Sequence, residues 1–229
     1  SDYDKLVAYL EYIKNAVSYN RDAANSLQPG AAPHPNDSPW QLIDVFHGTD
    51  TLNHKQVVCE GYAKAFQYLC DLTDSFKTNG IECALVTGTM SGGTGAGGTG
   101  AGDHMWNVVT IGSANYLVDV TNCDDGTVGA PDKLFLCGVT ENDASKKYTA
   151  VIDTLNSVTY EYDDNTLDNY NAEELALSDS AYTPPAELTG TVTIKGTPKI
   201  DVELTADTTD ITSTSPGTLS YKWYRDGDT

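Results

Sequence analysis

The sequence predicts an α+β protein in which helices precede an antiparallel sheet. Two amphipathic helical patterns, at residues 4–18 and from residue 59 to about residue 76, come before the segments with strand character. Two of those segments are joined by a turn sequence at residues 112–115, as in a hairpin. Because helical and strand patterns do not alternate along the chain, a parallel sheet of βαβ units is not expected.

The two helices are predicted from their apolar stripes and their end signals. Over residues 4–18, apolar side chains recur at steps of three and four residues, and Asp2 and Asp4 stand where carboxylates favour the positive end of the helix dipole. The second helix begins at Cys59, and Asn79-Gly80 beyond it is a helix-stop signal. The proline-rich segment 29–39 between the helices is expected to be a surface loop.

Strands are predicted at residues 83–86, 105–111 and 116–121, with a further short apolar segment at residues 134–136. Residues 91–103 are dominated by small residues, with seven glycines in positions 92–102. The stretch contains no Lys and is not a Walker motif, so it is not expected to bind phosphate. It is expected to be a flexible loop that ends one residue before His104.

Charge and hydropathy exclude several classes of partner. The chain carries 13 Lys and Arg against 33 Asp and Glu, a net charge of −20, which repels nucleic acids and anionic membranes. It has no apolar run of about 18 residues, so no membrane insertion is expected. The acidic composition, with 14 Tyr and 4 Phe, suits a soluble surface or secreted protein.

The five cysteines show neither a CxxC motif nor zinc-finger spacing: Cys59, Cys70, Cys83, Cys123 and Cys137. Neither a disulfide scaffold nor a metal site is therefore expected. Cys70 and Cys83 lie in apolar patterns and are expected to pack in the core, whereas Cys123 and Cys137 could form a bridge. A cysteine left without a bridge is either a buried apolar residue or a candidate nucleophile.

A domain boundary is predicted after an acidic stretch. Residues 161–187 hold eight acidic side chains and no Lys or Arg, and Pro184-Pro185 ends the stretch. We therefore expect a domain at residues 1–183, a linker at 184–187 and an all-β region at 188–229. The three strand segments of that region, 191–194, 202–205 and 219–224, are fewer than the roughly seven of a sandwich, so the region is expected to be incomplete.

Cys59, His104 and Asp119 are the residues that point to chemistry. A cysteine at a helix start has its thiolate favoured by the dipole, and in a triad a histidine pairs with the thiol while an aspartate orients the imidazole. Two alternative registers of the predicted hairpin would place His104 and Asp119 on the same face of the sheet. They lie directly opposite if the turn is centred at residues 111–112, and four residues apart if it occupies residues 112–115. Three unrelated buried residues are the alternative that spacing alone leaves open.

Four strings around these residues lie in a consistent order: Val-Cys-Glu-Gly-Tyr-Ala-Lys-Ala-Phe (58–66), Gly-Ile-Glu-Cys (80–83), His-Met-Trp-Asn-Val-Val (104–109) and Tyr-Leu-Val-Asp-Val-Thr (116–121). They resemble the transglutaminase-like superfamily of papain-like cysteine enzymes, and most closely its bacterial secreted and surface branch. The resemblance runs from about residue 50 to residue 139. The glycine-rich insertion before His104 and the sequence after Thr121 depart from the family pattern.

The resemblance implies a papain-like core, in which the helix of the nucleophile packs on an antiparallel sheet. It implies Cys59 as nucleophile, His104 as base and Asp119 as the residue that orients the imidazole. Three further residues fit the family's blocks as packing or supporting positions: Tyr62, Trp106 and Asn107. A side-chain amide shortly before the nucleophile, at Asn53 or Gln56, could join the Cys59 backbone amide as an oxyanion donor.

The C-terminal strings at residues 188–194, 204–207 and 219–227 resemble the first half of bacterial immunoglobulin-like repeats. That resemblance implies Trp223 as a core tryptophan, further strands after Thr229, and an extracellular or cell-surface setting.

The function expected from these residues is acyl transfer without a metal or organic cofactor. Cys59 would attack an amide of a protein or peptide, such as a cell-wall or host surface protein, and the acyl group would pass to water or to a lysine amine. The enzyme would then be a peptidase or amidase, or a transglutaminase. The alternative is a non-catalytic surface module that uses the papain-like groove for binding or adhesion.

Overall fold

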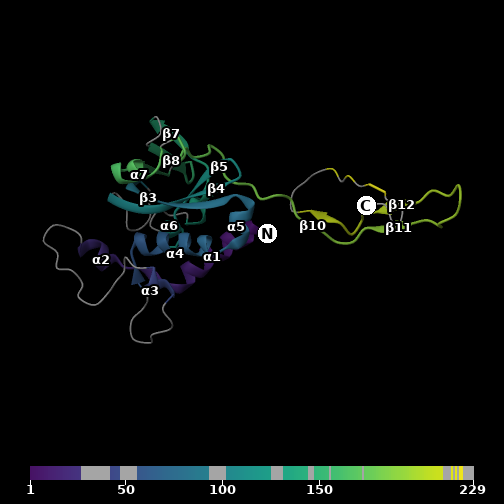
Figure 1. Ribbon diagram of the computed structural model, residues 1–229, viewed down its shortest axis with the longest axis horizontal. Coiled ribbons are helices and arrows are strands. Elements are labelled where there is room, and N and C mark those ends of the chain that lie inside the picture. The colour runs from purple at the N-terminus through teal and green to yellow at the C-terminus, as the bar shows by residue number, and fades with distance from the viewer. Residues whose placement is uncertain are drawn as a thin grey trace. The chain divides into compact units, whose positions relative to one another are not determined.

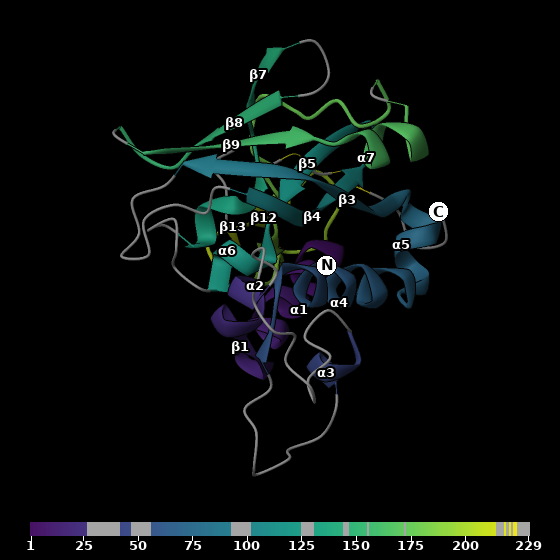
Figure 2. The ribbon, with the colours of Figure 1, turned by 90° about the vertical axis from the view of Figure 1, so that its left-hand side faces the viewer.

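The computed structural model describes residues 1–26, 42–46, 56–92, 102–124, 131–143, 147–154, 156–171, 173–213, 218, 220 and 222–223. The chain divides into two compact units, Ser1–Tyr182 and Thr183–Thr229. The first unit is a mixed α/β structure built on a curled antiparallel sheet (Figures 1 and 2). The predicted proline-rich loop and residues 93–101 of the glycine-rich stretch lie outside the described residues.

The sheet of the first unit has seven strands, and every neighbouring pair is antiparallel. The strands lie in the order β6 (Phe135–Cys137), β5 (Ala114–Val118), β4 (Gly102–Ile111), β3 (Ile81–Gly92), β9 (Ser157–Tyr162), β8 (Lys147–Val151) and β7 (Thr140–Asp143). The strand segments predicted between residues 83 and 136 lie largely in β3 to β6, whereas β7 to β9 were not predicted. Strand β3 is central because it pairs with both β4 and β9.

The larger helices cover one face of this sheet (Figure 2). Helix α4 (Cys59–Asp71) packs against β3 and β4, and α1 (Asp2–Ala16), α3 (Ile43–Phe46) and α6 (Val120–Asp124) pack against α4. The remaining helical segments are α2 (Arg21–Ser26), α5 (Asp74–Asn79), α7 (Asp164–Asn169) and the 3₁₀ turn η1 (Pro131–Leu134). A short parallel pair, β1 (Ser18–Tyr19) with β2 (Gln56–Val57), leads into α4.

Much of the buried core lies between α4 and the sheet, and a second group of buried aromatic side chains packs together from β4 and β9. Its largest fully buried side chains include Tyr62, Phe66, Phe76, Trp106 and Tyr160. Phe66 of α4 meets Phe135 of β6 edge-on, with ring centroids 6.3 Å apart. This contact ties the middle of α4 to the edge strand β6.

Helix α1 runs from Asp2 to Ala16 rather than over residues 4–18. Ser1 forms a capping box with Asp4, which starts the helix earlier than the apolar stripe alone suggests. Val17 has φ −137° and ψ 170°, an extended conformation that ends the helix. The acidic first turn matches the sequence expectation.

The single helix predicted from Cys59 to Phe76 is two helices, so that prediction was wrong. Helix α4 ends at Asp71, and α5 begins at Asp74 after Thr73, which is extended with φ −90° and ψ 101°. The Thr73 hydroxyl donates to the Leu69 carbonyl at 2.8 Å, so this side chain satisfies a terminal carbonyl of α4. The stop signal is confirmed, because Gly80 caps α5 in the left-handed conformation with φ 67°.

The hairpin takes neither of the two predicted registers. Ile111 pairs with Ala114, so the turn is Gly112-Ser113 alone, and Asn107 lies opposite Val118. The same register places His104 two residues out of step with Asp119, although both side chains stay on one face. The predicted strand 116–121 was also wrong in its last part, because β5 ends at Val118 and α6 begins at Val120.

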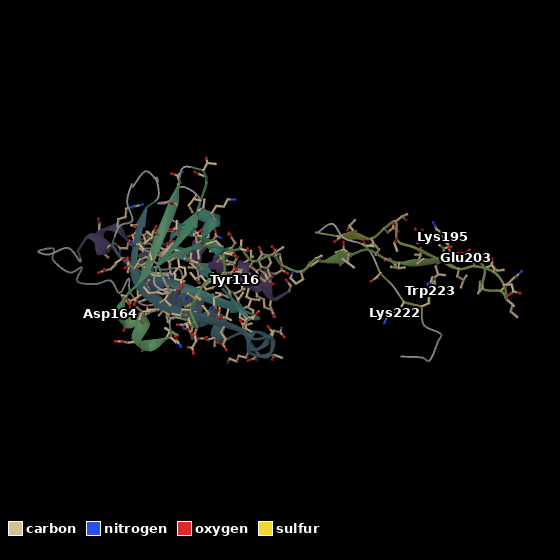
Figure 3. All side chains as sticks on the ribbon, turned by 90° about the horizontal axis from the view of Figure 1, so that it is seen from above. Tyr116, Asp164, Lys195, Glu203, Lys222 and Trp223 are labelled. Atoms are coloured by element: carbon tan, nitrogen blue, oxygen red, sulfur yellow. The ribbon has the colours of Figure 1, made fainter. Side chains whose placement is uncertain are left out.

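The second unit contains two strand pairs. Strand β10 (Leu188–Thr189) pairs with β13 (Thr212–Ser213), and β11 (Thr193–Lys195) pairs with β12 (Thr205–Asp207). Large apolar side chains of this unit are exposed, and Figure 3 labels four of its side chains, Lys195, Glu203, Lys222 and Trp223. Trp223 is 52% exposed in this chain, and its core position in a completed sandwich stays a prediction. No helix in the described ranges is long and apolar enough to cross a membrane.

Candidate active site at Cys59, His104 and Asp119

The structure brings the three predicted catalytic residues to one region of the first unit. Cys59 is the first residue of α4, His104 lies in β4, and Asp119 lies between β5 and α6. Helix α4 packs across β3 and β4, which carries its N-terminus to the part of β4 that holds His104. The triad geometry therefore depends on the packing of one helix on one hairpin.

Cys59 and His104 line a shared cavity of about 370 Å³. Cys59 is partly exposed, His104 is 9% exposed and Asp119 is fully buried. The cavity wall also includes Val58, Thr87, Gly88, Met105 and Asp163. The thiol can therefore meet a ligand from solvent, while the His104–Asp119 pair is shielded from water.

His104 is held between Asp119 and the Cys59 side chain. Its Nε2 lies 2.9 Å from Asp119 Oδ2, and the Cys59 side chain is close enough to contribute to the raised pKa of the imidazole. Because Nε2 is engaged with Asp119, Nδ1 is the ring nitrogen left for the thiol. The Trp106 ring stacks on the imidazole at 5.9 Å with an interplanar angle of 17°, which fixes the plane of the ring.

Asp119 receives hydrogen bonds from two residues that the sequence analysis missed. Tyr160 of β9 donates its hydroxyl to Oδ2 at 2.7 Å, and the Asn122 side-chain amide donates to the same oxygen at 2.6 Å. The backbone amide of Asn122 donates to Oδ1 at 3.2 Å. Asp119 thus caps α6 with one oxygen and holds His104 with the other, so its carboxylate has little freedom to rotate.

The charges of this pair stabilise each other. Burial by itself lowers the pKa of His104, but the Asp119 charge and hydrogen bond, with a smaller contribution from Cys59, outweigh burial and raise it to about 10. Burial by itself raises the pKa of Asp119, and the His104 charge and hydrogen bond outweigh it. The pKa of Asp119 therefore lies below its usual value. At neutral pH the pair is an imidazolium beside a carboxylate.

Tyr160 remains a hydrogen-bond donor over the whole accessible pH range. Burial, then the Asp119 charge, raises the pKa of the Tyr160 hydroxyl well above its usual value. Asn122 also places its amide 3.5 Å from His104 Nε2 and 3.1 Å from the Met90 sulfur. The surroundings of the carboxylate are therefore neutral donors together with one cation, an arrangement that favours the charged form of Asp119.

The predicted supporting residues have structural positions. Tyr62 is buried in α4 and donates its hydroxyl to Asp124, which ties α4 to α6. Asn107 is buried in β4 and donates to the Ala63 carbonyl of α4 at 3.1 Å. Trp106 stacks on His104 and also on Tyr162, with centroids 5.8 Å apart. These residues hold the helix, the hairpin and the imidazole in register.

The structure describes only one of the two predicted side-chain oxyanion donors, and that residue does not line the cavity. Asn53 lies outside the described residues. Gln56 is exposed in β2, two residues before the N-cap of α4, and is not one of the residues that line the cavity. The helix N-terminus itself offers backbone amides there, since Val58 makes no side-chain cap.

The other cysteines do not share the features of Cys59. None of the five cysteines forms a disulfide, and Cys59 is partly exposed whereas the other four are buried. Across the described ranges, no group of three or more His, Cys, Asp or Glu side chains could hold a metal ion. Comparison of the sequence with protein-family models and with curated proteins finds no match. The functional conclusions therefore rest on the geometry of the site.

Proposed function

We propose that the first unit is a transglutaminase-like cysteine enzyme with a papain-like core, which attacks amides of proteins or peptides through Cys59. The observation that carries the proposal is that Cys59, His104 and Asp119 form one connected chain of side chains beside a cavity. The order of contacts, from thiol to imidazole to carboxylate, is the order that nucleophilic catalysis by cysteine requires.

In the proposed reaction, the thiolate of Cys59 adds to the carbonyl carbon of a bound amide. The oxyanion that forms is stabilised by the Cys59 backbone amide at the start of α4, where the helix dipole is positive. His104 is cationic at neutral pH, so it is ready to give its proton to the nitrogen of the leaving amine. The products of this step are a thioester on Cys59 and a free amine.

The second step transfers the acyl group. Neutral His104 takes a proton from the water or amine that attacks the thioester, which releases the carboxylic acid or the new amide and restores the thiolate–imidazolium pair. Throughout the cycle Asp119 stabilises the imidazolium and keeps Nε2 directed away from the cavity. We favour water as the acceptor, because an amine acceptor requires a second binding site and water does not.

We also propose that the enzyme works outside the cell or on a bacterial surface. Support comes from the acidic composition and from the resemblance of the C-terminal strings to immunoglobulin-like repeats. A protein or peptide is the substrate class, since the cavity opens at the partly exposed Cys59. No nucleic-acid partner is proposed, because the chain carries a net charge of −20.

Selective alkylation tests the proposal. The intact chain would be treated with limiting iodoacetamide at pH 6, and the modified cysteine would be mapped by mass spectrometry. An ordinary thiol with a pKa of about 8.5 is almost fully protonated at this pH, so we expect labelling at Cys59 alone. The His104→Ala variant should lose that labelling, and Cys59→Ala should lose all turnover of peptide amides.

The buried Cys123 and Cys137 serve as controls within the same molecule. Their peptides should become labelled when the protein is denatured, which shows that they can be detected. Equal labelling of Cys59 in the wild type and in His104→Ala would contradict an activated pair. That result would favour the non-catalytic binding module instead.

A further inference from the structure

Two buried cysteines meet at the end of α4 that is remote from Cys59. Cys70 lies in the last turn of α4 and Cys83 lies in β3, and they are 4% and 8% exposed. Their side chains are close enough that Cys70 contributes to the raised pKa of the Cys83 thiol. One turn earlier in α4, the Gln67 side-chain amide donates to the Cys83 carbonyl at 3.1 Å, which holds helix and strand together at this point.

Both cysteines line a cavity of about 380 Å³ that is separate from the one at Cys59. The rest of its wall includes the exposed residues Asp71, Lys77 and Glu82. A small molecule can therefore approach the pair from solvent, although each cysteine is largely covered. The other buried cysteines, Cys123 and Cys137, do not line this cavity.

We propose that Cys70 and Cys83 are a disulfide-forming pair, which links α4 covalently to β3 when the protein meets a low-molecular-weight disulfide. The inference does not depend on the proposed catalytic function. Helix α4 carries Cys59 and β3 pairs with the β4 strand of His104, so the bridge would fasten the two elements that hold the candidate triad. It would also restrict the unfolded chain and so stabilise the fold.

The exchange balances in two steps. The Cys70 thiolate attacks one sulfur of the small disulfide, which forms a mixed disulfide and releases one small thiol. The Cys83 thiolate then attacks the Cys70 sulfur, which closes the protein disulfide and releases the second small thiol. The two protein thiols are oxidised, and the added disulfide is reduced to two thiols.

The second step should be slow at neutral pH. Burial, followed by the neighbouring Cys70 and the Asp71 charge, raises the pKa of the Cys83 thiol well above its usual value. A thiol in this state is rarely present as the attacking thiolate. The bridge should accordingly form faster at pH 8.5 than at pH 7, and the rate difference is itself a measurable consequence.

The test uses the full chain in a Cys59→Ser background, so that the exposed thiol does not consume the reagent. The protein would be incubated with excess bis(2-hydroxyethyl) disulfide at pH 8.5 and then unfolded in acid. Remaining thiols would be alkylated and mapped by mass spectrometry. We expect Cys70 and Cys83 to disappear together from the alkylated peptides and to appear as one linked peptide, while Cys123 and Cys137 stay alkylated.

Two further measurements make the result decisive. The oxidised protein should melt several degrees higher than the same sample after dithiothreitol, because the bridge restricts the unfolded chain. The Cys83→Ala variant should stop at a mixed disulfide on Cys70. Full alkylation of both cysteines after oxidation, a stable mixed disulfide in the parent protein, or a bridge to Cys123 or Cys137 would each overturn the proposal.

Discussion

Replacing Asp119 by Asn would remove the charge that holds His104 in its cationic form while keeping the shape of the side chain. In the wild type the pKa of His104 is raised to about 10. Without the carboxylate, the largest remaining influence is burial, which lowers the pKa of His104. We therefore expect the imidazole of Asp119→Asn to be neutral at pH 7, with a pKa below the ordinary value of 6.5.

The size of the effect follows from the two protonation equilibria. A difference between a pKa of 6.5 in the unfolded chain and about 10 in the native state corresponds to roughly 5 kcal/mol of native-state stability. Because the native pKa is the higher one, this contribution is complete below pH 6.5 and is lost as the pH rises through 10. The wild type should lose about 1.4 kcal/mol per pH unit within that window.

Asp119→Asn should not show this loss, since its His104 is neutral in both states above pH 6.5. Urea unfolding at pH 6.5 and pH 9 would measure the free energy of unfolding of both proteins. We expect the value for the wild type to fall by roughly 3 kcal/mol between the two pH values, while the value for Asp119→Asn stays flat. A titration of the His104 imidazole by NMR would give its pKa directly. His104→Gln is the matched control, because it lacks the titrating group and should show the same flat dependence.

Two outcomes would refute the reasoning. One is an imidazole that still titrates above pH 8 in Asp119→Asn, which would mean that Asp119 does not supply the stabilising charge. The other is an equal pH dependence of stability in the wild type and in the variant. Either result would also remove the basis for a cationic His104 in the proposed reaction.

Three further substitutions have expected outcomes that unfolding in urea can check. Tyr160→Phe removes a donor to the Asp119 carboxylate, so we expect a loss of about 1.5–3 kcal/mol and a higher pKa for Asp119; an unchanged stability would show that the bond contributes nothing. Phe66→Ala should cost about 3–5 kcal/mol, since the ring is fully buried between α4 and the sheet. Gly88→Ala would place its Cβ 2.0 Å from the Glu161 carbonyl oxygen, so β3 and β9 must separate, and we expect a loss of about 1–3 kcal/mol or more; wild-type stability would contradict that close approach.

The sequence was sufficient to locate the three candidate triad residues because each lies in a short local pattern. Cys59 stands at a helix start, and His104 and Asp119 stand near two strands joined by a two-residue turn. Same-face placement follows from the strand period alone, even though the register differs from both predictions. The sequence could not predict that His104 and Asp119 lie two residues out of step, because this offset depends on the residue at which the turn begins.

Tyr160 was missed for a different reason. Residues 157–162 do show alternating burial, and their period of two was a signal that could have identified β9 as a strand. Which strand β9 pairs with is decided by contacts far apart in sequence, since it joins β3 rather than β4. Local patterns carry no information about that choice, so the hydroxyl that reaches Asp119 could not be assigned.

Asn122 was missed because residues 116–121 were interpreted as one continuous strand. Asp119 instead caps a helix, and an Asp followed three residues later by an amide donor to it is a recognisable N-cap pattern. The same local chemistry explains why β5 ends at Val118. The strand pattern and the cap pattern compete over the same residues, and the cap determines the structure there.

The placement of the buried His104–Asp119 ion pair also supports a chemical role over a purely structural one. Removing both charges from water costs several kcal/mol for each ion, and apolar residues of similar volume often stabilise a core as well or better. Here the charged imidazole lies at a cavity wall that it shares with the partly exposed Cys59, and its hydrogen bond runs to Asp119. Neutral donors from β9 and α6 hold Asp119 in place. A pair that served only stability would gain nothing from ending at a thiol that solvent can reach, whereas a nucleophile requires that arrangement.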